Sequence, residues 1–212
     1  MLVLASASPR RRDLLAQAAY EFQIFPAEIC EELRAGENPI AYVLRLAREK
    51  AEAVAESAEF AKLRATGNKS TLILGADTTV VAPNREILLK PEDDADAARM
   101  LRLLSGATHQ VITGVALVSG DATEVAAEVT HVTVMSLTDE DIAGYITTGE
   151  PRGKAGAYAI QGRFGRWVPR IHGCYFNVVG LPLALVSTMI DAAGSRRDGA
   201  AITESILLSE EI

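Results

Sequence analysis

The boundary between the N-terminal strand and the first helix constrains this chain more than any other segment. Residues 2–5 form an apolar run that predicts a buried strand, and Ser8 before Pro9 is a typical helix start. Three consecutive arginines, residues 10–12, follow at once. Unpaired N–H groups at a helix N-terminus attract anions, and guanidinium groups grip phosphate oxygens, so the segment predicts an anion site for a polyphosphate. An ordinary capped helix with solvated arginines is the alternative interpretation.

Strand-like and helix-like segments alternate along the chain, which predicts a mixed α/β or α+β fold rather than a bundle or a sandwich. Strands are predicted at residues 2–5, 22–27, 71–81, 109–118, 124–135 and 157–160. Helices are predicted at residues 9–19, from 39 through the fifties, and at 94–104, 138–145 and 183–193. A hairpin turn is expected at residues 83–85, a loop at 60–70, and a loosely attached tail at 194–212. No linker divides the chain, so we expect a single domain over residues 1–212.

An acidic composition excludes several classes of protein. The chain has 212 residues, 49% of them hydrophobic, and a net charge of −7, which argues against a protein that coats nucleic acid. Cys30 and Cys174 lie far apart in the sequence and suggest neither a zinc site nor a disulfide framework. The N-terminus is unlike a signal peptide, and the longest apolar run, residues 178–190, is too short to cross a bilayer as a helix. We expect a cytoplasmic protein with no nucleic-acid or membrane partner.

The candidate chemistry centres on Asp77, which stands in the apolar strand predicted at residues 71–81. An interior carboxylate is costly unless its charge is paired or used, so Asp77 binds a metal or a water, or pairs with a lysine for structural reasons. Lys90 follows the predicted hairpin and returns toward Asp77. Lys50 on the long helix and Lys154 among small residues add positive charge. Together with the first arginines, these lysines fit phosphoryl-transfer chemistry.

Other chemistries lack their residues. The sequence contains no P-loop, no dinucleotide-binding glycine motif and no nucleophile elbow. His109, His131 and His172 are dispersed, and His109 is predicted to be a buried, hydrogen-bonded structural histidine rather than a catalytic one. Metal-assisted hydrolysis with a carboxylate-activated water remains.

The chain resembles the Maf proteins over nearly its whole length. These proteins were named septum formation inhibitors and are regarded as house-cleaning nucleoside triphosphate pyrophosphatases. The resemblance lies in residues 4–11, 45–51, 75–78, 90–91, 104–106, 109–111, 149–151, 154–158, 160–162 and 179–182. It implies an extended mixed β-sheet flanked by helices, with two lobes around a deep cleft. It also implies hydrolysis of a nucleoside triphosphate between its α- and β-phosphates with Mg²⁺ or Mn²⁺, and it is compatible with a homodimer.

The resemblance also implies roles for individual residues. Asp77 is the proton acceptor that activates water, and Glu31 is its partner in holding the metal or the water. Lys50 and Lys90 act with them on the phosphates. Phosphate binding is further expected from the start of the first helix and from the late lysine: Ser6, Ser8, Arg11 and Lys154.

Three positions distinguish branches of the Maf family, and here they hold Arg10, Thr78 and Gln161. This combination is similar to the branch that acts on dTTP, UTP and modified pyrimidine nucleotides. A glutamine amide both donates and accepts hydrogen bonds, which suits the edge of uracil. Two alternatives remain: the same reaction on 7-methyl-GTP or another purine nucleotide, and a nucleotide-sensing regulator of cell division without turnover. Arg163, Arg166 and Arg170 are expected to add positive charge to the cleft.

Overall fold

The computed structural model describes residues 1–65 and 71–197, which form a mixed sheet with helices on both faces. The strands are β1 (Leu2–Leu4), β2 (Phe22–Ile24), β3 (Leu72–Val81), β4 (Ile87–Leu88), β5 (Thr108–Ser119), β6 (Ala122–Thr133) and β7 (Arg170–His172). The α-helices are α1 (Pro9–Gln17), α2 (Pro39–Glu56), α3 (Ala58–Ala65), α4 (Asp94–Leu104), α5 (Asp139–Ile146), α6 (Tyr175–Val179) and α7 (Leu183–Arg197). Two short 3₁₀ helices, η1 (Ala155–Ala157) and η2 (Arg163–Trp167), complete the described elements.

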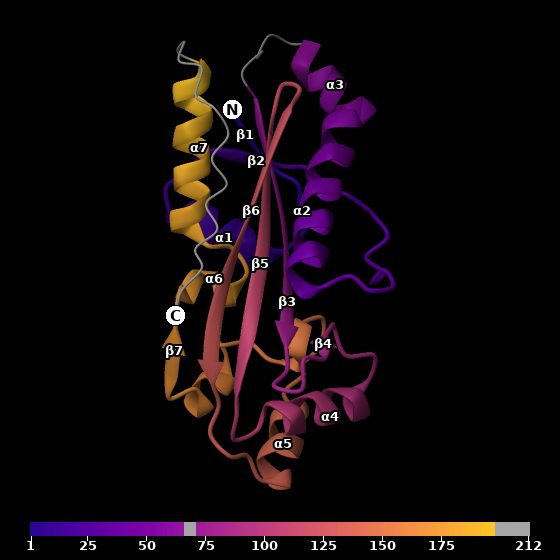
Figure 1. The fold of residues 1–212 in the computed structure, drawn as a ribbon, viewed down its shortest axis with the longest axis vertical. Coiled ribbons are helices and arrows are strands. Elements are labelled where there is room, and N and C mark those ends of the chain that lie inside the picture. The colour runs from indigo at the N-terminus through magenta and orange to yellow at the C-terminus, as the bar shows by residue number, and fades with distance from the viewer. Residues whose placement is uncertain (66–70, 198–212) are drawn as a thin grey trace.

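The sheet has seven strands in the order β2-β1-β3-β5-β6-β7, with β4 paired to one end of β3. The pairs β1–β2 and β1–β3 are parallel, and the others are antiparallel. The long strands β3, β5 and β6 run through most of the length of the molecule, and α4 and α5 lie at one end of them (Figure 1). The predicted mixed fold is therefore confirmed, and β5 and β6 form an antiparallel hairpin.

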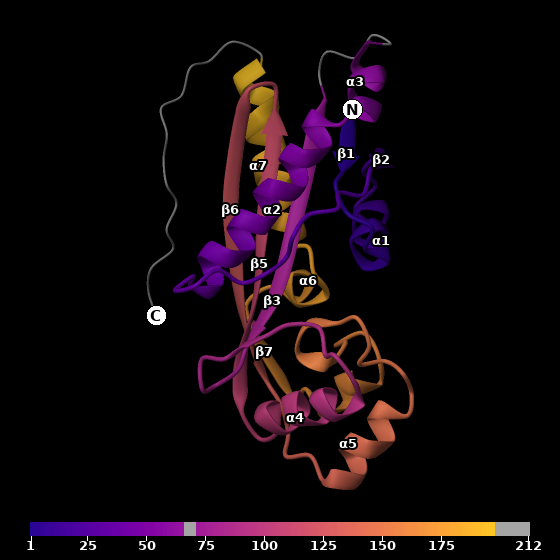
Figure 2. The same ribbon diagram turned by 90° about the vertical axis from the view of Figure 1, so that its right-hand side faces the viewer.

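Alternating side chains of β3 point to opposite faces of the sheet and belong to the separate cores there. Leu72 and Leu74 pack in one cluster with residues of α1 and α7, whereas Ile73 packs in another with Ala47 and Ala51 of α2. Accordingly, α2 and α7 cover opposite faces of the long strands (Figure 2). A third cluster fills the end formed by α4, α5 and the two 3₁₀ helices. Among the described residues, no helix is both long and apolar enough to cross a membrane.

Two local predictions were wrong. The strand expected at residues 157–160 is absent, because Gly156 and Ala157 adopt left-handed backbone angles, with φ of 68° and 59°, that an extended strand excludes. Part of the loop expected at residues 60–70 is the helix α3, and its remainder, 66–70, lies outside the described residues. The last helix is longer than predicted, since α7 continues to Arg197; the rest of the tail expected at 194–212, residues 198–212, lies outside the described part of the chain.

Candidate functional site

A cleft opens where one edge of β3 is not covered by a neighbouring strand. The strand β1 pairs with β3 as far as Leu74, and β4 pairs with β3 from Val80 onward. Asp77 and Thr78 lie between these two pairings and line a cleft of about 550 Å³. The turn between β1 and α1, the residues after β4, and the turns near residues 153–161 and 178–180 form its other walls.

The cleft contains every residue that the sequence predicted for catalysis, phosphate binding or substrate specificity. These residues are Ser6, Ser8, Arg10, Arg11, Glu31, Lys50, Asp77, Thr78, Lys90, Lys154 and Gln161. Its lining has five basic side chains and two acidic ones, whereas the whole chain has a net charge of −7. Positive charge concentrated in a concave site of an acidic protein favours an anionic ligand.

Two carboxylates share the ammonium group of Lys50 at the floor of the cleft. The Nζ atom of Lys50 lies 2.6 Å from Oδ1 of Asp77 and 2.6 Å from Oε1 of Glu31. The side chains of Asp77 and Lys50 are only 12% and 9% exposed, so the pair is largely shielded from water. The predicted need of Asp77 for a charged partner is confirmed, and the partner is Lys50.

The alternation of β3 explains why these two side chains meet. Asp77 follows Ile73 and Gly75 at two-residue intervals, so it points to the face of the sheet that α2 covers. Gly75 lies so close to α2 that a Cβ atom there would be 2.1 Å from the carbonyl oxygen of Ala47. This close approach brings Lys50, one turn farther along α2, over the strand.

Glu31 lies between two lysines on the segment that joins β2 to α2. Its second oxygen, Oε2, accepts a hydrogen bond of 3.1 Å from Nζ of Lys90. Partial burial raises the pKa of Glu31, but the hydrogen bonds and charges of Lys50 and Lys90 outweigh it and lower that pKa to about 2. The carboxylate is therefore ionised at neutral pH.

Arg11 lies on the other side of β3 and ties three parts of the cleft together. Its Nε donates to the carbonyl oxygen of Gly180 at 2.8 Å, Nη1 to Oγ of Ser6 at 3.2 Å and Nη2 to Oγ1 of Thr78 at 3.1 Å. A guanidinium has five N–H groups, so two remain for a ligand. Ser8 occupies the N-cap of α1, as predicted, but its side chain makes no capping hydrogen bond.

Of the basic residues after position 150 that the sequence assigned to the cleft, only Lys154 lines it. Lys154 donates a hydrogen bond to the carbonyl oxygen of Glu150, and burial together with the charge of Arg10 lowers its pKa. The expectation that Arg163, Arg166 and Arg170 add charge to the cleft was wrong, since none of them lines it.

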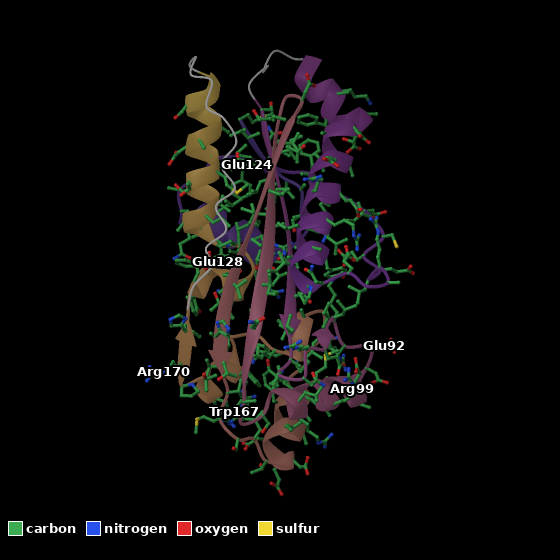
Figure 3. The ribbon with its side chains drawn as sticks, in the orientation of Figure 1. Glu92, Arg99, Glu124, Glu128, Trp167 and Arg170 are labelled. Carbon is green, nitrogen blue, oxygen red and sulfur yellow. The ribbon has the colours of Figure 1, made fainter. Side chains whose placement is uncertain are left out.

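Local contacts explain why Arg166 and Arg170 lie outside the cleft. The guanidinium of Arg166 lies 4.0 Å from the centre of the Trp167 ring, and Nη2 lies 3.5 Å from Oδ1 of Asp141. Arg170 belongs to β7 and extends from the outer edge of the sheet (Figure 3).

Sequence reasoning did not single out two tyrosines that line the cleft. The hydroxyl of Tyr42 donates to the carbonyl oxygen of Glu31 at 2.8 Å, and burial together with the charges of Asp77 and Glu31 raises its pKa to about 12. Tyr158 bonds through its hydroxyl to Nε2 of His109 at 2.8 Å. The signal for Tyr42 was its position two helical turns before Lys50 on the buried side of α2.

His109 is a structural residue, as predicted. It is 1% exposed, packs in the core at the α4 end of the molecule and does not line the cleft. Its ring meets Tyr158 edge to face, with 5.4 Å between the ring centres.

The donor set fits a divalent cation of the magnesium type. Asp77 and Glu31 approach one atom, Nζ of Lys50, so their oxygens lie close together. Mg²⁺ is commonly held by one or two carboxylates together with substrate phosphates. No cluster of three or more ligand-type side chains occurs among residues 1–65 and 71–197, so phosphate oxygens and water would complete the coordination.

Comparison with known proteins shows to which family the chain belongs. A family model described as "Maf-like protein" matches residues 1–193. The chain belongs to the Maf family. A Koribacter versatilis protein named dTTP/UTP pyrophosphatase is 53% identical over 91% of this chain and 94% of its own length. A Salmonella typhimurium protein of the same name is 48% identical over 93% of this chain and 95% of its own.

A solved structure, that of the Staphylococcus aureus Ham1 protein, matches 90% of this Maf chain and 98% of its own. The TM-score is 0.41 with 12% sequence identity, a likeness too weak to carry an argument. The Maf resemblance predicted from the sequence motifs is thus confirmed by the family match and by relatives that cover almost the whole chain.

Proposed function

We propose that this Maf protein is a pyrophosphatase that hydrolyses dTTP and UTP to the monophosphate and pyrophosphate. Relatives about half identical over nearly the full length are named for this activity, which supports the substrate assignment. The observation that carries the proposal for the site is the Asp77–Lys50–Glu31 cluster, in a cleft whose other charged side chains are all basic.

Asp77 acts as the general base in this proposal. Its carboxylate takes a proton from a water molecule, and the water oxygen bonds to phosphorus at the α–β bridge. The bond from that phosphorus to the bridging oxygen breaks, and the bridging oxygen leaves with the bond's electron pair on the other product, which is pyrophosphate when the α-phosphorus is attacked. Lys50 orients the carboxylate through its 2.6 Å contact and, together with Glu31, keeps it in one position.

The basic side chains hold the triphosphate while the charge on its oxygens grows. Arg11 presents its two remaining N–H groups from the start of α1, and Lys90 and Lys154 approach from the opposite walls. The hydroxyl groups of Ser6 and Ser8 supply further hydrogen bonds to the phosphates.

Asp77 and Glu31 are the proposed ligands of a divalent cation, Mg²⁺ or Mn²⁺. Such a cation, when bound with the substrate, neutralises charge on the phosphate oxygens. The residues of the chain would still provide the base, the positioning and the recognition of the nucleotide.

Recognition of the pyrimidine is assigned to Arg10, Thr78 and Gln161. Gln161 lies at the exposed rim, where its amide can donate to and accept from the uracil edge. Thr78 is held by Arg11 and by Thr113, whose hydroxyl is 2.9 Å away. The names of the relatives favour pyrimidine nucleotides over 7-methyl-GTP. The presence of Asp77, paired with Lys50, as a general base favours turnover over nucleotide sensing alone.

The proposed setting is the cytoplasm, where Cys30 and Cys174 would stay reduced. A homodimer is the proposed assembly, and light scattering measures it directly.

The test is hydrolysis of a nucleotide panel with Mg²⁺ or Mn²⁺, following both monophosphate and pyrophosphate. The panel contains dTTP, UTP, 5-methyl-UTP, pseudouridine triphosphate, GTP and 7-methyl-GTP. We expect pyrimidine-selective turnover, and we expect Asp77→Asn to lower kcat by about a hundredfold or more because it removes the base. Asp121→Asn, in the exposed turn between β5 and β6, is the matched control and should behave as wild type.

Each contrary result would remove a defined part of the proposal. Wild-type turnover by Asp77→Asn would exclude Asp77 as the base. Preference for 7-methyl-GTP would transfer the protein to the purine alternative, and tight binding without hydrolysis of any nucleotide would favour the regulator.

A further inference from the structure

The segment that carries Glu31 has little structure of its own. Residues 25–38, between β2 and α2, form neither helix nor strand. Glu31 nevertheless reaches Lys50 and Lys90 with both carboxylate oxygens. Contacts outside the segment must hold it at this distance from β3.

Arg45 of α2 grips this segment at two points. Its Nε and Nη2 atoms donate to the two carboxylate oxygens of Glu37 at 2.6 and 2.7 Å, a forked pair. Nη2 also donates to the carbonyl oxygen of Glu32 at 3.1 Å, directly after Glu31. The side chains of Arg45 and Glu37 are only 13% and 10% exposed. Such a forked, shielded pair is more restrictive than an ordinary surface ion pair.

Tyr42 adds a contact on the other side of Glu31. Its buried hydroxyl donates to the carbonyl oxygen of Glu31 at 2.8 Å, so the peptide groups of residues 31 and 32 are both bound to α2. Glu49 extends the cluster, because it accepts hydrogen bonds from Nη2 of Arg34 at 2.9 Å and from Nη1 of Arg45 at 3.2 Å.

The same helix holds the partner of Glu31. Tyr42, Arg45 and Glu49 recur at helical spacing along α2, and Lys50 follows directly. The clamp and the ammonium group therefore belong to one rigid element. Fixing the segment to α2 fixes the carboxylate of Glu31 relative to Lys50 and, through Lys50, relative to Asp77.

We propose that Arg45, with Tyr42, is a positioning residue that clamps residues 31–37 to α2 and so holds Glu31 in the active site. This inference rests on the proposed function for its catalytic consequence. Arg45 does not line the cleft, so its effect passes through Glu31 rather than through contact with the nucleotide.

The first test is a double-mutant cycle on hydrolysis of dTTP. Arg45→Lys keeps the charge but loses the fork, and we expect kcat/KM to fall about tenfold or more, as for other residues that orient a functional ligand. In the Glu31→Gln background, measured with excess enzyme, the same substitution should cause less than about a twofold further loss. An equal loss in both backgrounds would overturn the proposal, because Arg45 would then act independently of Glu31.

Arg99→Lys is the matched control, because it makes the same substitution at an arginine that also pairs with carboxylates. Arg99 also contacts two carboxylates, those of Glu86 and Asp96, but it belongs to α4 at the far end of the molecule (Figure 3). It should leave kcat/KM unchanged.

The second test is amide hydrogen exchange of residues 28–37, a measurement that does not depend on nucleotide hydrolysis. Arg45→Lys and Tyr42→Phe should speed exchange in this segment several-fold, while Arg99→Lys should not. Unchanged exchange in both clamp variants would overturn the proposal. If the wild-type protein hydrolyses no nucleotide, the proposed function fails while the exchange result still decides whether the clamp exists.

Discussion

Lys50, Asp77 and Glu31 form ion pairs inside the cleft, and this pairing determines how the three charges behave. Lys50 contacts two carboxylates, and Glu31 contacts two lysines, so neither end of the cluster carries an uncompensated charge. Removing one partner from such a cluster leaves the other charge desolvated and unpaired. The resulting loss in the free energy of unfolding is larger than the stabilisation that the pair itself provides. The residue-scale arrangement explains why an acidic side chain persists inside an apolar strand.

His109 is the contrasting case of a buried titratable group without a charged partner. Burial, with a smaller contribution from the charge of His131, lowers its pKa from 6.5 to about 4. Between pH 4 and 6.5, His109 binds a proton more readily in the unfolded chain than in the folded one. The free energy of unfolding should therefore rise as pH increases from about 4 to 6.5. The shift corresponds to an effect on the order of 3 kcal/mol.

Replacement of His109 by glutamine should therefore flatten the stability profile in this pH window. Thermal unfolding at several pH values measures the effect, and Tyr158→Phe is the control, because it removes the hydrogen bond at Nε2 but keeps the titrating ring. The same slope in wild type and His109→Gln would show that another group controls the pH dependence.

At the scale of elements, the distance between α2 and the sheet depends on two glycines. A Cβ atom at Gly114 would lie 2.4 Å from the carbonyl oxygen of Val43, much as one at Gly75 would meet that of Ala47. The two residues lie on neighbouring strands, β3 and β5, under successive turns of the helix. Any larger residue at either position must push the backbone of α2 away from Asp77.

Gly75→Ala should both destabilise the protein and reduce its activity. We expect a loss of about 1–3 kcal/mol in the free energy of unfolding from overpacking, and a lower kcat because α2 carries Lys50 away from Asp77. Denaturant unfolding and dTTP hydrolysis measure the two effects. Gly144→Ala is the control, since that glycine lies in α5 with nothing within 4 Å of its Cβ position, and it should be neutral or slightly stabilising. Unchanged stability of Gly75→Ala would contradict the close approach of the helix.

At the scale of the whole molecule, three long strands join the two ends. The core around α4 and α5 includes Val80 and Val111, while the core near α1 and α7 includes Leu74 and Val115. Strand β3 carries Val80 and Leu74, and β5 carries Val111 and Val115, so neither core can lose these strands without disturbing the other. We propose on this ground that both ends form one cooperative domain.

Trp167 provides a probe for that proposal, because it is the single tryptophan of the sequence and belongs to the core at the α4 end. Unfolding curves from its fluorescence and from far-UV circular dichroism should coincide, as expected for a two-state transition. A fluorescence transition at clearly lower denaturant concentration would show that this end unfolds by itself.

Local sequence signals predicted much of this fold. The β5–β6 hairpin follows from two β-branched runs around a glycine turn, and the start of α5 follows from the capping box of Thr138 and Asp141, which is present. Elements that depend on distant contacts were missed. The strand β7 exists through pairing with β6, and α6 is held by Asn177, whose amide donates to Val111 and Thr130.

For the site, the sequence by itself determined which residue types are present and, through family motifs, which of them belong together in one cleft. It also indicated that Asp77 needs a partner, since burial of a lone carboxylate is unfavourable whatever the fold. Only the tertiary structure decided that the partner is Lys50, that Arg163, Arg166 and Arg170 lie outside the cleft, and that Tyr42 and Arg45 bind the segment of Glu31. These facts depend on distances between residues far apart in the chain, and such distances are set by tertiary packing, for the Glu31 segment that of α2 on the sheet, rather than by local propensity.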